Sequence, residues 1–490
     1  MNNSRKNRAP SPDYCSPDQL VIPGFESPFS RTLNPSNRWV RLAKLIPWDS
    51  LSNIYLKAFP VKSTGRPPLS PRVVIGSIII KHICDLDDRE TVDQISENMY
   101  MQYFLGYSSF TNEPPFDASL FVEFRKRLGK DQLNQINDVL YQINQTRENE
   151  KKAVASDNEE SKDNDPPTHS GTIILDATAC PADIAYPTDL GILNDCRVKL
   201  EALMDFTFKH SSCTRKPRNY REKARKDYLS TAQKKRKSAI EIRKAIGKQL
   251  SYIKRDLSII EHLLDHCSQI PFDAHQYKYW LVIQHAYAQQ LQMYQTHTHT
   301  IEDRIVSIHQ PHVRPIVRGK STAKIEFGAK INVSLVNGLT FLDDLEWNAF
   351  NEGVRLPASI ANFKERTGHY PEFVLADKIY CTRDNRRLLK ELGIILKAKP
   401  LGRPSIQAAQ NRVSPGERNP IEGKFGQAKR AYGMNRIMAR LARTSESWIA
   451  SIILVLNLVN LAEAALLWIK WFISKYCLVF RSSQHHVLCC

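Results

Sequence analysis

The chain has 490 residues, with 69 Lys and Arg against 51 Asp and Glu, which gives a formal net charge of +18. Hydrophobic residues make up 42% and aromatic residues 9%, which is enough for sizeable cores and excludes a disordered chain, a collagen or a coiled-coil rod. The length predicts two or three domains. The positive excess favours a polyanionic partner, nucleic acid first and an anionic membrane second.

Signals for export and for resident metals are weak. The first residues are polar and Pro-rich and lack the apolar run of a signal peptide, so a cytoplasmic protein is expected. The ten cysteines include no C-x-x-C pair, which indicates reduced thiols rather than a disulfide framework or a zinc ribbon. His297 and His299 have no Cys or acid at zinc spacing, so a polar helix end is favoured there.

One segment, from Ser451 to Trp471, is long enough to cross a bilayer. Asn457, Asn460 and Glu463 interrupt it, and each would be costly in hydrocarbon without a partner. A buried helix is therefore favoured over a membrane helix, and no membrane partner is expected.

The N-terminal part has helical patterns after a polar arm. Residues 1–36 show no period and are expected to be flexible, and residues 37–148 are expected to form a DNA-binding domain. Helices are predicted from Ser70 and Pro71, which suit a cap and a first helical position, after Asp88, and after Asp117.

The third of these helices carries basic side chains beside an apolar stripe. Arg125 and Arg127 lie next to Phe121 and Phe124 in the sequence pattern. Three short helices that end in a basic one are typical of a helix-turn-helix-like unit, in which Arg125 and Arg127 would read bases. A small helical bundle with a solvated charged face is the alternative.

A polar, acidic stretch at 149–169 predicts a linker. The segment 170–465 then mixes strands with helices, which predicts an α+β catalytic domain, followed by a tail at 466–490. A helical insertion is expected at about 190–300. Strand patterns, including a hairpin with the turn Asn337-Gly338, occur at 172–176, 304–309, 324–336, 339–343 and 373–376.

The insertion holds most of the net charge. Between Lys209 and Arg255 there are 17 basic and 3 acidic residues, so the segment carries 17 − 3 = +14. A charge run is usually a solvated helix face, but one so one-sided repels itself without a counter-charge. Binding of the DNA phosphate backbone is therefore predicted, with the densest cluster at Lys234, Lys235, Arg236 and Lys237.

Three acids stand where a metal site would need them. Asp176 and Asp377 end apolar strands, and Glu422 opens a helix. A site that handles phosphodiesters with two divalent ions needs oxygen ligands from separate elements. Carboxylates about 5 Å apart would repel by roughly 3 kcal/mol per pair at an effective dielectric of 20, so the set predicts two Mg²⁺ or Mn²⁺ ions.

Several blocks of the sequence resemble the DDE transposases of bacterial insertion sequences, over about residues 40–465. The blocks that carry the resemblance are GRPPLSP at 65–71, DASLFVEFRKRL at 117–128, LDATACPADIAYPTDLGILN at 175–194, IRKAIGKQLSYIKRDL at 242–257, ADKIYCTRDNRRLLKELGI at 376–394, LGRP at 401–404 and RNPIEGKFGQAKRAYGMNRIMARLARTSES at 418–447. The resemblance implies an RNase H-like fold in which Asp176, Asp377 and Glu422 bind the catalytic metals.

The family also has a Tyr, Arg, Glu and Lys signature around its glutamate. Arg418, Glu422 and Lys429 match it, whereas Pro415 stands at the tyrosine position, so a role for that tyrosine cannot be carried over. Arg418 and Lys429 are expected on DNA phosphates, with solvated surface cations as the alternative.

The resemblance implies a transposase, associated with the bacterial nucleoid, that cleaves and transfers DNA strands. Its partners would be double-stranded DNA, both the inverted-repeat ends and the target, and a second copy of the chain, as a homodimer or higher assembly in the DNA complex. A non-catalytic DNA-binding regulator derived from a transposase is the alternative.

Overall fold

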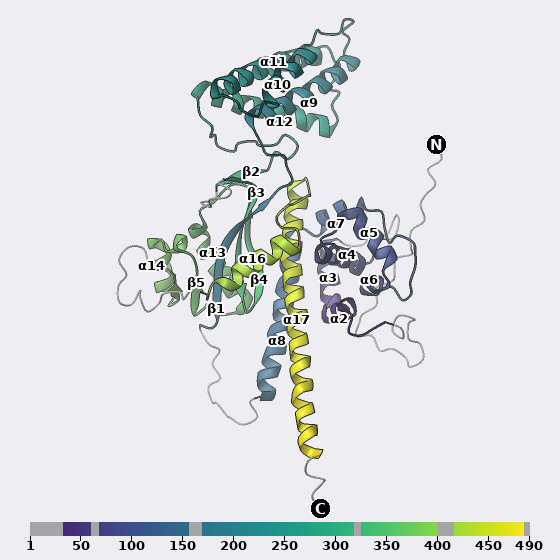
Figure 1. Ribbon diagram of the computed structural model, residues 1–490, viewed down its shortest axis with the longest axis vertical. Helices are drawn as coiled ribbons and strands as arrows, with labels where there is room; N and C mark the ends of the chain where they lie inside the picture. Colours follow the sequence, from purple (N-terminus) through teal and green to yellow (C-terminus); the bar gives the residue numbers. More distant parts are fainter. Residues whose placement is uncertain (1–32, 60–67, 156–168, 318–324, 399–415, 485–490) are drawn as a thin grey trace, which may run out of the picture.

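The computed structural model describes residues 33–59, 68–155, 169–317, 325–398 and 416–484, and the statements below concern these ranges. Most of the arm expected at 1–36, the LGRP block and Pro415 lie outside them. The described chain is mixed α and β, with a helical N-terminal region, a mixed sheet and a second helical unit (Figure 1).

The N-terminal region is helical, as the sequence predicts. Its helices are α2 (Arg38–Leu45), α3 (Trp48–Ala58), α4 (Pro71–Cys84), α5 (Asp88–Glu97), α6 (Met99–Phe104), α7 (Leu120–Arg127) and α8 (Lys130–Ala155). The second predicted helix is divided in two, because the side chain of Asn98 accepts the backbone N–H groups of Tyr100 and Met101 and so starts α6. The linker expected from residue 149 begins inside α8, which continues to Ala155.

The sheet has β1 at its centre. Its strands are β1 (Thr172–Pro181), β2 (Arg314–Val317), β3 (Ile325–Val336), β4 (Leu339–Glu346), β5 (Phe373–Leu375) and β6 (Ile395–Lys397). β1 pairs antiparallel with β3, which in turn pairs antiparallel with β2 and β4, while β5 and β6 continue the sheet in parallel on the other edge of β1. The predicted hairpin is confirmed: Asn337 and Gly338 have φ of 50° and 79°, the left-handed values of a tight two-residue turn.

The strand expected at 304–309 is wrong. Ile305 and Ile308 are buried, but they pack in the core of the helical insertion rather than in the sheet. The backbone N–H of Ile305 donates to the side chain of Gln289. An apolar, β-branched run was thus used for packing and not for strand pairing.

The chain between β1 and β2 forms the helical unit at the top of Figure 1. It consists of α9 (Asp189–His210), α10 (Arg221–Ala232), α11 (Ala239–Asp265) and α12 (Ala274–Thr296). These helices enclose an apolar core of their own, which includes Leu193, Ile253 and Ile283. Arg304 donates to Asp189 at 2.6 Å, and this contact holds the two ends of the unit together.

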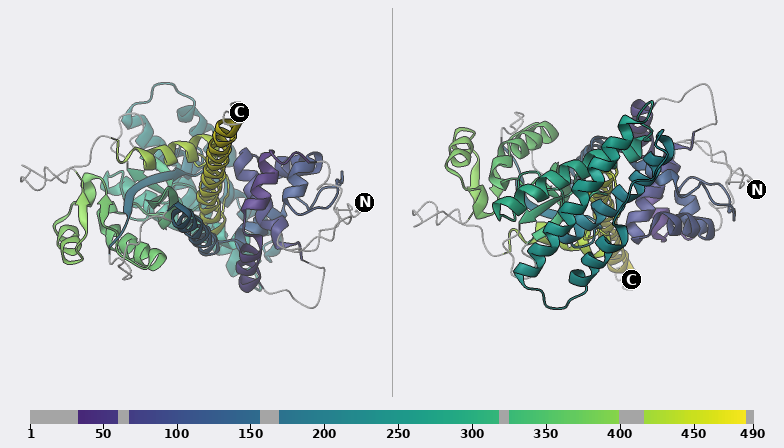
Figure 2. Two further views of the ribbon diagram at one scale, coloured as in Figure 1. Left: turned by 90° about the horizontal axis from the view of Figure 1, so that it is seen from below. Right: turned by 90° about the horizontal axis from the view of Figure 1, so that it is seen from above.

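The long helix α17 (Ala442–Gln484) lies between the N-terminal helices and the sheet, beside α8 (Figures 1 and 2). Its segment Ala442–Glu463 is long and apolar enough to cross a membrane, but 78% of the apolar window is buried inside the protein. Asn457 is fully buried and bonds to Asn137 on α8 and to both backbone groups of Thr340 on β4. The polar residue that interrupts the apolar run is therefore satisfied by protein groups.

The other elements cover the sheet or flank its edge. They are η1 (Glu352–Arg355), α13 (Leu356–Thr367), η2 (Lys378–Tyr380), α14 (Arg383–Glu391) and α16 (Asn419–Ala431). α16 contacts both β1 and α17. The end of the sheet near η2 is thus bordered by short elements that bring polar side chains together.

The structure places Arg125, one of the two predicted base-reading residues, in a buried ion pair. Its side chain is 6% exposed and forms two hydrogen bonds to the Asp88 carboxylate, at 2.9 and 2.7 Å. Lys81 reaches the same carboxylate at 3.0 Å, and both cations lie over the ring of Trp448 on α17. Arg125 therefore points toward the protein interior, where its positive charge neutralises the carboxylate of Asp88.

Arg127, by contrast, is exposed, and its guanidinium lies near Tyr55 and over the ring of Phe59. We therefore expect Arg125→Ala to lower the free energy of unfolding by about 2 to 3 kcal/mol, since it leaves a half-buried carboxylate with one partner fewer. Arg127→Ala should change it by less than about 0.5 kcal/mol. Urea unfolding of both variants tests this, and equal losses would contradict it.

Candidate active site

Asp176 lies on β1 beyond the point where β5 stops pairing with it. The register places Ile174 opposite Leu375. Asp176 and Asp377 each lie two residues beyond this pair, Asp176 within β1 and Asp377 just after the end of β5. One oxygen of Asp176 accepts the N–H of Ala177 at 2.8 Å. Burial raises the pKa of Asp176, and Arg418 acts against this shift.

Asp377 follows β5 and starts η2. Its Oδ1 accepts the N–H of Lys378 at 2.8 Å, so the carboxylate caps this short helix. The side chain of Asp377 is 55% exposed, against 19% for Asp176. One carboxylate is thus set into the sheet and the other faces solvent.

Arg418 connects the two aspartates. Its Nη2 lies 3.3 Å from Asp176 and its Nη1 lies 3.3 Å from Asp377. The guanidinium therefore occupies the position between two like charges and neutralises their repulsion. Residues from three separate segments are brought together by this fork.

Glu422 lies one helical turn after Arg418, in the first turn of α16, and its side chain is exposed. Positions four apart share a face of a helix, so the glutamate lies on the same side of α16 as the arginine that binds both aspartates. Lys429 lies two turns further along this face. The predicted signature residues therefore lie at the N-cap of α16 and along this helix, which contacts β1 (Figure 1).

Glu352 is a fourth acid that the sequence analysis missed. Its charge acts on both Asp176 and Tyr380, and together with burial it raises the pKa of each. Lys330 on β3 forms an ion pair with it at 2.9 Å. No strand end marked this residue, because it sits in η1, a single turn of 3₁₀-helix that has no sequence pattern of its own.

Hydrogen bonds fasten η1 to the turn that follows Asp377. The Asn385 side chain donates to the carbonyls of Gly353 and Tyr380, at 2.7 and 2.9 Å. A Cβ on Gly353 would come within 2.6 Å of the Ile379 carbonyl oxygen, so only glycine permits this close approach. Tyr380 in turn donates to Asn332 on β3 at 2.8 Å. The carboxylates therefore rest on a rigid, buried frame.

The basic cluster of the insertion lies in the loop between α10 and α11, and all four of its side chains are exposed: Lys234, Lys235, Arg236 and Lys237. Lys234 pairs with Glu241 at 2.8 Å, and Lys237 donates to the Ala232 carbonyl. Within the described ranges, Lys235 and Arg236 form no such contact. These two are the cations most available to an external anion.

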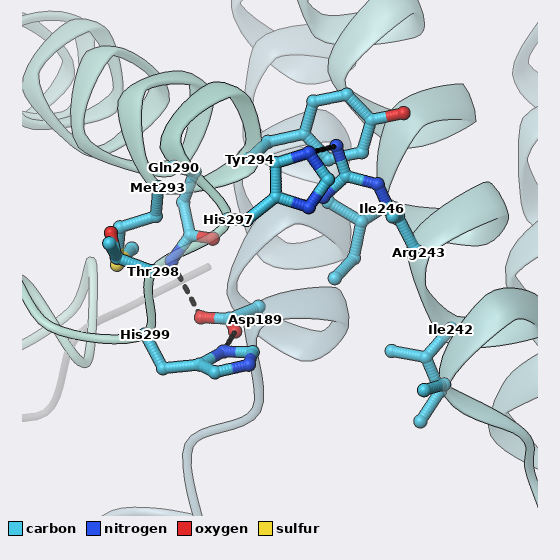
Figure 3. Close-up of a pocket in the computed structure, with 11 residues that line it drawn as sticks. Asp189, Ile242, Arg243, Ile246, Gln290, Met293, Tyr294, His297, Thr298 and His299 are labelled. Carbon is cyan, nitrogen blue, oxygen red and sulfur yellow. Dashed lines mark hydrogen bonds and ion pairs between the residues drawn. The ribbon is translucent and has the colours of Figure 1, made fainter.

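A pocket in the insertion holds the two histidines noted above (Figure 3). His297 caps α12 and lies 3.1 Å from Arg243 of α11, and His299 lies 3.9 Å from Asp189. The same Asp189 carboxylate accepts from Gln290 at 3.1 Å. These polar groups pair with one another across three helices, which fits the expected helix-end role of the histidines.

Comparison with known proteins gives two family matches. The model of the "Transposase DDE domain" matches residues 374–459, which include Asp377, Arg418, Glu422 and Lys429. The model of the "Transposase domain (DUF772)" matches residues 27–127. These matches cover two parts of the chain and indicate a transposase function.

A curated relative of this transposase is the "Uncharacterized protein ORF8 in nfe locus" of Rhizobium meliloti, which is 35% identical over 112 residues. The match covers 23% of this chain and 53% of the relative, so the chain spans about half of that protein's length. No solved structure matches the transposase.

DDE transposases use divalent metal ions, and the donor set here fits them. Asp176, Asp377 and Glu422 offer only carboxylate oxygens, the ligands preferred by Mg²⁺ and Mn²⁺. The Arg418 guanidinium already places a positive charge between the aspartates.

We expect Mn²⁺ to raise the midpoint of thermal unfolding of the wild type, because an ion that binds only the folded state stabilises it. Asp377→Asn should abolish most of this rise, since it removes a ligand charge. Glu365→Gln, at an exposed acid of α13, is the matched control and should retain it. A full rise in Asp377→Asn would remove this residue from the ion site.

Proposed function

We propose that this transposase binds the terminal inverted repeats of an insertion sequence and catalyses metal-dependent cleavage and strand transfer at DNA ends. The observation that carries the proposal is the Arg418 fork between Asp176 and Asp377, with Glu422 one turn away. Two acids from separate segments flank one cationic position, and a third lies four residues along the chain from that arginine; phosphodiester chemistry with two ions requires oxygen ligands from separate segments.

An RNase H-like fold of the catalytic domain is part of the proposal. The strand order β4-β3-β1-β5-β6 supports it, since β1, β3 and β4 form an antiparallel meander and β5 and β6 add parallel strands beside β1. The helical unit α9–α12 is an insertion between the first two strands of that meander.

In the proposed reaction, Asp176, Asp377 and Glu422 hold two Mg²⁺ or Mn²⁺ ions. When bound, such ions activate water or a 3′-hydroxyl for in-line attack and stabilise the leaving oxygen. Arg418 releases at least one aspartate and turns its fork to a DNA phosphate, while Lys429 adds a point charge further along α16. The frame of Asn385, Gly353 and Tyr380 keeps the aspartates in place.

DNA affinity would come mainly from the insertion, and choice of sequence from the N-terminal domain. Arg125 is buried and paired with Asp88, whereas Arg127 is exposed, which favours Arg127 as the base-reading residue of α7. Two copies of the chain, acting on a pair of ends at the nucleoid, complete the proposal. A regulator without catalysis is the rival, and it would bind the ends without nicking them.

Cleavage of labelled element ends with Mg²⁺ tests the function. Asp176→Asn, Asp377→Asn and Glu422→Gln keep side-chain volume but remove charge, so each should lower the cleavage rate by orders of magnitude while DNA binding persists. Glu365→Gln is the control and should cleave normally. Binding by the wild type without any nicking would favour the regulator.

The basic loop gives a separate expectation. Changing Lys235 and Arg236 to Gln should weaken binding to end and random DNA alike and lower the slope of log affinity against log salt by about 1 per lost phosphate contact. Lys234→Gln should have a smaller effect, because this lysine already pairs with Glu241. The measurement is DNA affinity over a series of salt concentrations. Slopes equal to that of the wild type would indicate that these side chains do not contact DNA.

A further inference from the structure

A cluster of metal-ligand side chains lies at the far end of the insertion, outside the carboxylate site. One ligand atom each from Cys213, His262 and His266 lie within 4.8 Å of one another. Cys213 is half-buried and the two histidines are exposed. Sequence spacing gave no sign of this group, because the cysteine is in the loop after α9 and the histidines are at the end of α11.

The two histidines are already oriented. They are four residues apart, so they share one face of the last turn of α11, and their ring centroids are 4.5 Å apart. Nδ1 of His266 lies 2.8 Å from the carbonyl oxygen of His262. A ring nitrogen that donates to a carbonyl fixes the tautomer and leaves the other nitrogen, Nε2, to bind a metal.

The loop with the cysteine is fastened to the same helix end. The backbone N–H and the hydroxyl of Ser212 both donate to the carbonyl of His266, at 3.0 and 3.1 Å, across 54 positions of sequence. Cys213 is therefore held next to the histidine pair by contacts that need no metal. A preorganised ligand set loses little entropy when an ion binds.

Negative groups lie beside the ligands, within an insertion that is strongly basic as a whole. The carbonyl end of α11, which carries the negative end of the helix dipole, points into this region. Glu261 and Asp265 lie on the same last turn. Cys267 follows His266, and its thiol donates to the Leu263 carbonyl at 3.3 Å. Burial and the nearby Cys213 raise the pKa of this thiol.

We propose that Cys213, His262 and His266 bind one structural Zn²⁺ ion, with water in the fourth position. One thiolate and two imidazoles are a donor set typical of tetrahedral zinc. The ion would join the loop after α9 to the end of α11 and so hold the basic residues Arg215 and Arg218 of that loop in place. This site is independent of the carboxylates and of the proposed reaction.

The test uses the full-length protein without a histidine tag, stripped of metal and kept under a thiol-free reductant. Zinc is titrated in competition with a chromophoric chelator. The wild type should take up one equivalent tightly at this site. Cys213→Ser and His262→Ala should each weaken binding by more than about 100-fold, the upper range for loss of an outer-shell partner.

Two matched controls separate this site from others. Cys267→Ser changes a neighbouring thiol and should keep the wild-type affinity; a loss as large as that of Cys213→Ser would overturn the three-ligand assignment. With Co²⁺ in place of zinc, a thiolate-to-metal charge-transfer band should be present in the wild type and in Asp377→Asn, and absent in Cys213→Ser. Absence of the band in the wild type would overturn the proposal.

Limited proteolysis tests whether the ion joins the loop after α9 to the end of α11. Trypsin cuts after exposed Arg215 and Arg218, and zinc should slow these cuts several-fold in the wild type but not in Cys213→Ser. Circular dichroism of each variant verifies that it is folded. Equal cutting rates with and without zinc in the wild type would show that no ion joins the two segments.

Discussion

The burial of α17 is the constraint on which the rest of the architecture depends. From Ile449 to Leu458 every residue of this helix is buried, and an apolar surface of that extent can be removed from water only if several elements cover it at once. The helices α2, α4 and α7 cover one side, α8 a second, and β4 and α16 a third. The N-terminal and catalytic parts therefore share one core rather than meeting across a polar linker, and the cluster of Lys81, Asp88 and Arg125 against Trp448 belongs to that shared core.

The candidate site differs from this core, because it brings carboxylates of like charge together instead of burying apolar surface. Without a counter-charge the carboxylates would repel one another, and Arg418 and Lys330 supply it in this structure. Arg418 immediately precedes α16, so its side chain can reach both aspartates from the start of that helix.

Features that depend on a local sequence pattern were predictable, whereas contacts between residues far apart in the sequence were not. The hairpin at Asn337-Gly338, the position of Asp377 after β5 and the helix at Pro71 each follow from a signal within a few residues. The strand expected to end at Asp176 instead continues to Pro181, because β3 pairs with it along its whole length. The burial of Arg125 was not predicted, because its partner Asp88 lies 37 residues away. The run at 304–309 was predicted as a strand, but its apolar residues pack in a core formed by the helices of the insertion. Glu352 and the Cys213 cluster also depend on distant segments that only the fold brings together.

The ion pair between Asp189 and Arg304 also bears on how the sheet assembles. β1 must find β3 across the whole of residues 182–324, and an open loop of that length adds a conformational entropy cost that grows with the logarithm of its length. Once the helical unit has folded on its own core, this pair brings its two ends together and the effective loop shrinks to a short connection. We therefore expect the folded insertion to lower the entropy cost of pairing β1 with β3.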